Sequence, residues 1–204
     1  MLKGIKEAIL YPVSDASWLK RWTGWWIFCA LWFTIPLLVL HFIATVRQAI
    51  HNPTEPTLPE LEQDWKGWIR GLAASLTLFG PLFVVLLGIL SSADAQTLPE
   101  TVILDITLCT AFAFSLTVPA AAILYALKGE LFTMFRPKKL LEIVRLNFQQ
   151  YALLLGLQSV FFILWCSLTY LVPAFSIWLY PALPFFVFSY ARLLGFYYRD
   201  NTAV

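Results

Sequence analysis

Charged residues are scarce in this chain. Asp, Glu, Lys and Arg make up 13% of its 204 residues, against about a quarter in ordinary soluble domains. Hydrophobic residues make up 60% of the chain, and its mean hydropathy is +0.74. The net charge is only +2, so nucleic acid is not expected as a partner. This composition excludes an ordinary water-soluble fold and is typical of a membrane protein.

Side chains that perform catalysis or bind metals are also scarce. The chain has two histidines and three cysteines, and Cys29, Cys109 and Cys166 stand far apart inside apolar runs. The sequence contains no CxxC pair, no HExxH or GxSxG motif and no glycine-rich phosphate loop. We therefore expect no enzyme activity, no cofactor and no metal site. The cysteines are interpreted as small apolar packing residues.

Long charge-free runs, in contrast, are abundant. They cover residues 22–46, 71–93, 106–127 and 146–191. About 20 helical residues cross a hydrocarbon layer of ~30 Å, so the fourth run has room for two spans. Its break is predicted at "VPAFS", residues 172–176, where proline and small polar residues permit a turn. The runs predict an all-α, polytopic membrane helix bundle with about four full transmembrane helices, in a single integral-membrane domain over residues 1–204.

The first charge-free run has Pro36 in its middle. A proline inside a helix removes one hydrogen bond and clashes with the preceding turn, so we predict a helix break at Pro36. Residues 22–35 and 37–46 then form the two half-length arms of a re-entrant N-terminal hairpin, which the full spans must cover. The alternative is a single kinked span with an exterior N-terminus.

The distribution of charges favours the re-entrant hairpin. With this hairpin all 14 Lys and Arg residues fall on one face of the membrane. The opposite face receives the acids Asp94, Glu100 and Asp105 and no base. The positive-inside rule then places both the N-terminus and the C-terminus in the cytoplasm.

Three stretches that follow a proline are amphipathic. They begin at Pro12, Pro59 and Pro137, and an apolar residue stands six positions after each: Trp18, Trp65 and Ile143. Such helices lie in the headgroup plane of a bilayer. The predicted interfacial anchors are Trp18, Trp65 and Trp68. The repeated pattern suggests three units of one helix plus one hairpin, over residues 1–50, 51–127 and 128–204.

Basic residues near the third stretch and near the last span are candidates for lipid binding. Each base close to a membrane surface attracts anionic lipid by about 1 kcal/mol. Arg192 is expected to bind a lipid phosphate, to pair with an acid such as Asp64, or to extend to the interface. The predicted lipid-interface residues are Arg136, Lys138, Lys139, Arg145 and Arg192.

Two further titratable residues stand in or beside apolar runs. His41 has the chemistry of a ligand for a metal, haem or chlorophyll, but no second ligand stands at a suitable spacing. A neutral imidazole that bonds to the broken backbone near Pro36 is the simpler interpretation. Asp105 stands at the outer end of the third run, where a hydrated carboxylate costs little; a proton relay there would need a partner that the neighbouring spans do not supply.

Motifs in four places indicate a family. They are a "YP-x-x-D-x-x-W" opening, a segment similar to "FIATVRQAI", an "LPE…DW…G" segment and a closing "AR-x-x-G" helix end. The corresponding residues are Tyr11, Pro12, Asp15 and Trp18, then Leu58, Pro59, Glu60, Asp64, Trp65 and Gly71, and finally Ala191, Arg192 and Gly195. Together they resemble the bacterial and archaeal integral membrane family listed as domain of unknown function 4013.

The resemblance covers nearly the whole chain. The sequence departs from the family pattern in the linker "HNPTEPT", which is longer and richer in proline than the family leads us to expect. The family has no established activity, so the resemblance implies a membrane architecture and assigns no catalytic residue. We expect an accessory, scaffold or lipid-associated component of the bacterial inner membrane, or of an internal membrane derived from it. Its expected partners are membrane lipids, other proteins or further copies of the chain. The alternative is a small oligomeric transporter or channel that uses the broken helix around Pro36.

Overall fold

The computed structural model describes residues 2–14, 19–20, 23, 35–53, 65–94, 99–129, 136–171 and 182–202. Within these residues every regular element is helical, which confirms the predicted all-α class. The elements are α1 (Leu2–Leu10), the 3-10 turn η1 (Tyr11–Val13), α3 (Ile35–His51), α4 (Trp65–Asp94), α5 (Glu100–Lys128), α6 (Pro137–Leu146), α7 (Phe148–Leu171) and α9 (Ala182–Thr202). Counting only helical residues that the structure describes, no helix combines the length and the apolarity needed to cross a membrane.

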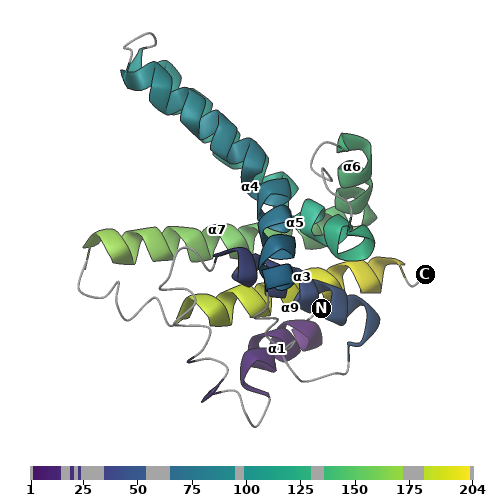
Figure 1. Cartoon of the computed structure of the whole chain (residues 1–204). Helices are drawn as coiled ribbons and strands as arrows, with labels where there is room; N and C mark the ends of the chain where they lie inside the picture. The colour runs from purple at the N-terminus through teal and green to yellow at the C-terminus, as the bar shows by residue number, and fades with distance from the viewer. Residues whose placement is uncertain are drawn as a thin grey trace.

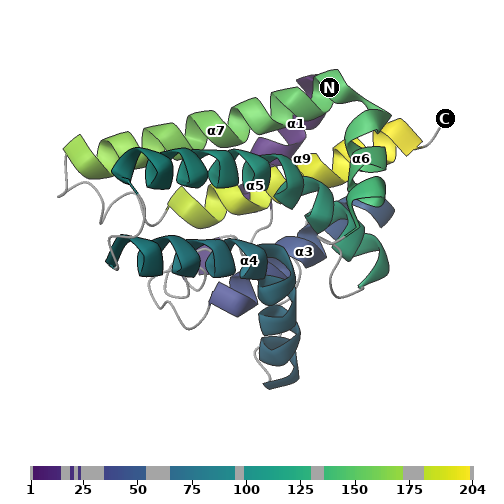
Figure 2. The ribbon, with the colours of Figure 1, turned by 90° about the horizontal axis from the view of Figure 1, so that it is seen from above.

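Two helical hairpins project to the same side of the molecule (Figure 1, Figure 2). α4 pairs with α5, and α7 pairs with α9. The two hairpins diverge towards their tips (Figure 1), and α6 and the C-terminus lie at the end opposite to both tips (Figure 2). The fourth charge-free run therefore divides into two helices, as predicted. The predicted break at residues 172–176 lies outside the described residues.

α3 occupies the centre of the opposite end, where it contacts α4, α5 and α9. Two glycines allow neighbouring helices to approach it closely. A Cβ atom on Gly71 of α4 would lie 2.1 Å from the carbonyl oxygen of Pro36, and one on Gly195 of α9 would lie 2.3 Å from the Cβ atom of Ala49. A residue with any side chain would force these helices apart.

Pro36 is the second residue of α3. Backbone amides in the first turn of a helix have no hydrogen-bond acceptor within the helix, so a proline there costs no helical hydrogen bond. The helix therefore begins where the sequence predicted a break. α3 then continues beyond the end of the charge-free run, as far as His51. The other half of the predicted hairpin, residues 22–35, lies almost wholly outside the described residues, so the re-entrant hairpin stays a prediction.

The hydrophobic core lies around α3 and the adjoining helix ends. We call this part the base: α3, α6, residues 119–128 of α5 and residues 188–202 of α9. Residues 119–126 of α5 are buried on every side, and the small side chains Ala120, Ala121 and Ala122 let the neighbouring helices pack closely. At the end of α5, Gly129 adopts a left-handed conformation at φ 64°, and Arg47 donates to the Ala126 carbonyl at 2.7 Å.

The outer parts of the two hairpins form what we call the arms. The first arm is residues 80–94 of α4 with residues 100–118 of α5. The second arm is residues 152–171 of α7 with residues 182–187 of α9. Within the second arm, Phe161 stacks on Phe186 with ring centroids 3.5 Å apart. Tyr190 donates a hydrogen bond to the side-chain oxygen of Gln158 at 2.8 Å.

α4 differs from the prediction. The sequence suggested a separate surface helix from Pro59 followed by a span, but α4 runs without interruption from Trp65 to Asp94. It changes direction in its middle, so that its first part runs across α5 and its second part alongside it (Figure 2). Gly80 and Pro81 lie in the interior of the helix, and proline is a common cause of such a bend.

α6 is a separate amphipathic helix, with Pro137 as its first residue. Its apolar side chains Leu140 and Ile143 are buried in the core of the base. The third amphipathic stretch is therefore confirmed as a helix, but its apolar face packs against α5 and α9. Phe148, the next large apolar residue along the chain, belongs to α7 and is 66% exposed.

Candidate functional site

Large apolar side chains cover the outer surface of the arms. Phe112 of α5 is 73% exposed, Val84 of α4 is 71% exposed and Ile163 of α7 is 61% exposed. Helices that face water carry polar residues at such positions. Exposed apolar side chains in such number are often found where a protein contacts a membrane or another protein. The other exposed apolar residues of the arms are Leu87, Val102, Ile106, Leu153, Leu157, Val160 and Leu164.

The base carries the predicted lipid-interface residues, and most of them face outwards. Arg136, Lys138 and Arg145 are exposed on or beside α6, and Lys139 is half-buried. Lys128 is exposed at the end of α5. The structure therefore gathers these bases at the end of the molecule opposite the tips of the arms (Figure 2). Their binding of lipid stays a prediction.

Arg192 differs from the other four, because it is only 4% exposed. Its guanidinium group donates to the Pro53 carbonyl and lies over the ring of Tyr11, 4.2 Å from the ring centroid. Tyr11 in turn donates to the side chain of Gln48 at 2.7 Å. Arg192 thus holds the N-terminal segment and the end of α3 against α9. Its other suggested partner, Asp64, lies outside the described residues.

Tyr151 of α7 inserts its hydroxyl group into α5 beside Pro119. The hydroxyl accepts a hydrogen bond from the Ala120 amide at 3.2 Å and donates one to the Leu116 carbonyl at 2.6 Å. In a regular helix these two backbone groups, four residues apart, bond to each other. The hydroxyl satisfies both groups without water. Tyr151 therefore fixes α7 to the point where α5 passes from the first arm into the base.

Tyr197 of α9 has the same role at the joint between α6 and α7. Its hydroxyl donates to the Ile143 carbonyl at 2.7 Å and accepts from the Asn147 amide at 3.3 Å. Burial raises the pKa of this hydroxyl, which keeps it protonated and able to donate. The rings of Tyr151 and Tyr197 lie 5.6 Å apart between centroids. The two tyrosines thus join four helices through neighbouring contacts.

Amide side chains complete the joint between α6 and α7. The side-chain oxygen of Asn147 accepts from the Gln150 amide at 3.1 Å, as an N-cap of α7. Asn147 also donates to the side-chain oxygen of Asn201 at 3.1 Å. Asn201 donates to the side-chain oxygen of Gln150 at 3.0 Å. These bonds tie the last turn of α9 to the start of α7.

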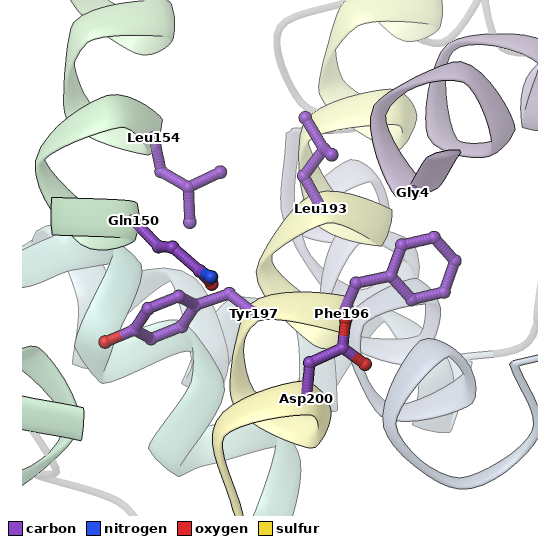
Figure 3. A pocket seen from close by; sticks show the side chains of 7 residues that line it. All are labelled: Gly4, Gln150, Leu154, Leu193, Phe196, Tyr197 and Asp200. Carbon is purple, nitrogen blue, oxygen red and sulfur yellow. The ribbon is translucent and has the colours of Figure 1, made fainter. Parts of the chain in front are cut away.

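A small cleft lies between α1, α7 and α9 (Figure 3). Its volume is about 40 Å³, which is room for a few water molecules. A metabolite or a solute pathway needs several hundred cubic ångströms, on the order of 300–1,000 Å³. The lining residues are Gly4, Gln150, Leu154, Leu193, Phe196, Tyr197 and Asp200.

The remaining candidates do not converge on one site. His41 is buried in α3, whereas Asp105 is exposed on the first arm. Across the described ranges, no group of three His, Cys, Asp or Glu side chains is placed to share a metal ion. Trp65 is 70% exposed and stacks on Trp68, with ring centroids 5.2 Å apart. Trp18, the third predicted anchor, lies outside the described residues.

Comparison with known proteins gives one result. No curated protein and no solved structure matches the chain. Residues 24–179 match the family described as "Protein of unknown function (DUF4013)". The match includes Trp65 and Gly71, while Tyr11, Arg192 and Gly195 lie outside it. Because the matched residues make up more than half of the chain, the protein belongs to the DUF4013 family.

Proposed function

We propose that this protein is a multi-pass membrane protein with a non-catalytic, lipid-associated accessory role. The observation that carries the proposal is the apolar outer surface of the arms. Phe112, Val84 and Ile163 are each more than half exposed, and in water such surface would cost about 25 cal/mol for each Å². The charge-free runs in the sequence, which include residues beyond those described, support the same environment.

The separation of charge supports one orientation. The exposed bases of α6 and the end of α5 lie at the base, whereas the sequence at the tips of the first arm carries the acids Asp94 and Glu100. Under the positive-inside rule the base faces the cytoplasm of a bacterial cell. The proposed location is the inner membrane or an internal membrane derived from it.

An accessory role is favoured over transport because the buried polar groups contact other parts of the chain. Gln158 accepts from Tyr190, Arg192 donates to the Pro53 carbonyl, and the Tyr151 hydroxyl bonds to α5. These side chains hold helices together, and the cleft that the structure describes between α1, α7 and α9 is too small for a solute. Membrane lipids, and protein partners or further copies of the chain, are the proposed binding partners.

Accessibility of single cysteines tests the orientation. Cysteine is introduced at Asn52, Gln96 or Val204 in a chain whose native cysteines are replaced by alanine. An impermeant maleimide added to intact cells should label position 96 and leave positions 52 and 204 unlabelled until the membrane is opened. Labelling of position 52 from outside would contradict the proposed orientation.

Purification in mild detergent tests the accessory role. A partner protein that copurifies in a fixed ratio would support it. A homo-oligomer that conducts a solute in reconstituted liposomes, and loses this activity when Pro36 is replaced by alanine, would contradict it in favour of transport.

A further inference from the structure

The first part of α4, residues 65–79, runs across the direction of the arms (Figure 2). One face of this segment packs against α3. Its buried residues Gly67, Gly71, Ala74 and Leu78 recur at the helical spacing of four, three and four positions. The close approach of Gly71 to Pro36 fixes the segment in this direction. The segment is therefore held across the arms by the base.

The outward face of the same segment is divided into an apolar and a basic stripe. Trp65, Ile69 and Leu76 are exposed, and Trp65 and Leu76 each expose more than half of their surface. Lys66 and Arg70 are also exposed. Each base follows an apolar residue by one position, which places the two stripes about 100° apart around the helix. This division is typical of helices that lie in the plane of a membrane surface.

The exposed surface of the base beyond this segment is mostly polar, although Leu141 and Leu146 of α6 are 48% and 39% exposed. The exposed residues of α6 include Lys138, Glu142 and Arg145, and the last turns of α9 expose Asp200 and Thr202. The end of α3 exposes Arg47, His51 and Asn52. Such a surface fits water better than hydrocarbon, where a central charge costs at least about 2.5 kcal/mol.

The longer helix of each arm has a length that agrees with a boundary at the same level. Residues 100–118 of α5 extend over about 28 Å at the helical rise. Residues 152–171 of α7 extend over about 30 Å. Both lengths match the hydrocarbon layer of ~30 Å. Beyond them, α5 reaches Pro119 and the Tyr151 contact, where its surface becomes completely covered by protein.

We propose that residues 65–79 of α4 lie in the phospholipid headgroup layer, with the apolar stripe towards the acyl chains and the basic stripe towards the lipid phosphates. The bilayer ends at this level, and the base projects from it into water. The last nine residues of α5's charge-free run, residues 119–127, then lie outside the lipid. This inference rests on the proposed membrane insertion of the arms.

Depth measurements with spin labels test the inference. Single cysteines replace exposed residues in a chain without native cysteines, which is labelled with a nitroxide and reconstituted in phosphatidylglycerol and phosphatidylethanolamine vesicles. Phe112 and Ile163 report on the arms, Ile69 on α4, and Leu141 and Thr202 on the base. Dissolved oxygen relaxes a nitroxide in hydrocarbon, and a water-soluble nickel chelate relaxes one in water.

The expected order of depth is clear. Labels at 112 and 163 should respond to oxygen, labels at 141 and 202 to the nickel chelate, and the label at 69 should lie at an intermediate depth. Two results would show that the proposed boundary is wrong while the insertion of the arms is correct. In the first, labels at 112 and 163 lie in hydrocarbon and so does the label at 141 or 202. In the second, the label at 69 lies as deep as the label at 112. If labels at 112 and 163 respond to nickel as strongly as 141, both proposals fail.

Discussion

The base and the arms are both helical and apolar, but they differ in how far their large apolar side chains are exposed. Within α5 alone, Phe112 on the arm is 73% exposed, whereas Ile123 in the base is completely buried. Both residues belong to one charge-free run. The base encloses its apolar residues with protein, while the arms present theirs to the surroundings. The comparison teaches that hydropathy along a helix does not by itself say what covers it.

The polar contacts follow the same division. Most of the long-range hydrogen bonds described above lie in the base or at its edge. There the side chains of Tyr151, Tyr197 and Arg192 each donate to a backbone carbonyl. The Ile143 and Pro53 carbonyls lie at a helix end and in a turn, where the helical ladder leaves groups to satisfy, and the Leu116 carbonyl lies inside α5, three residues before Pro119. The base is thus a specific joint between helices, and the arms are its apolar extensions.

The largest contrast is expected from one phenylalanine in each part. Phe188→Ala should lower the free energy of unfolding by about 3–5 kcal/mol, because it empties a filled position in the core. Phe112→Ala should change it by less than about 0.5 kcal/mol in mild detergent, because this side chain packs against little protein. Thermal unfolding of both variants measures the difference. Equal losses would show that the arm is covered by part of this chain.

Glycine substitutions should give the next largest effect. Gly71→Ala and Gly195→Ala place a methyl group within 2.3 Å of another helix, and this overpacking should cost about 1–3 kcal/mol. Gly88→Ala and Gly156→Ala serve as controls in the arms, where a Cβ atom meets nothing within 4 Å. The controls should be neutral or gain up to about 1 kcal/mol from helix propensity. Denaturant titration would contradict the close crossings if all four variants were equally stable.

Removal of a hydroxyl group should have a moderate effect. Tyr151→Phe leaves the Ala120 amide and the Leu116 carbonyl without the bridging hydroxyl, at a cost of about 1–3 kcal/mol. Hydrogen exchange of the Ala120 amide should become faster. Tyr198→Phe, at a half-buried position on α9, is the matched control and should leave that amide unchanged. An unchanged exchange rate in Tyr151→Phe would show that α5 closes its own ladder at Pro119.

Exchange of an arginine for lysine should have the smallest measurable effect. Arg192→Lys loses the planar group that lies over Tyr11 and should cost about 1 kcal/mol. Arg199→Lys alters a partly exposed pair with Asp200 and should change stability by less than about 0.5 kcal/mol. The melting temperatures of the two variants separate these outcomes. A larger loss from Arg199→Lys would reverse the roles assigned to the two residues.

Sequence patterns predicted the helical class, the two hairpins and the separate helix at Pro137. They missed α1, although Leu2, Ile5 and Ile9 already follow the three-and-four spacing of an amphipathic helix. They also separated the surface part of α4 from its apolar part. The continuous helix was not predictable from the change in composition, because a bent helix keeps the backbone hydrogen bonds of both parts.

The candidate site was less predictable than the fold. Arg192 was recognised from a motif, but its partners Tyr11 and Pro53 lie more than a hundred positions away in the chain. Tyr151 and Tyr197 stand among other aromatic residues, and nothing in their spacing marks them. Their roles depend on which backbone groups each hydroxyl reaches, and packing sets that.

The sequence by itself determined that the chain is helical, that its apolar residues are gathered in long runs, and that its bases avoid the predicted outer loops. These properties depend on local periodicity and on composition. The tertiary structure decided which half of each run is enclosed and which tyrosines join the helices. The physical reason is that burial and hydrogen bonding depend on neighbours brought together by the fold, and in this chain those neighbours are far apart in sequence.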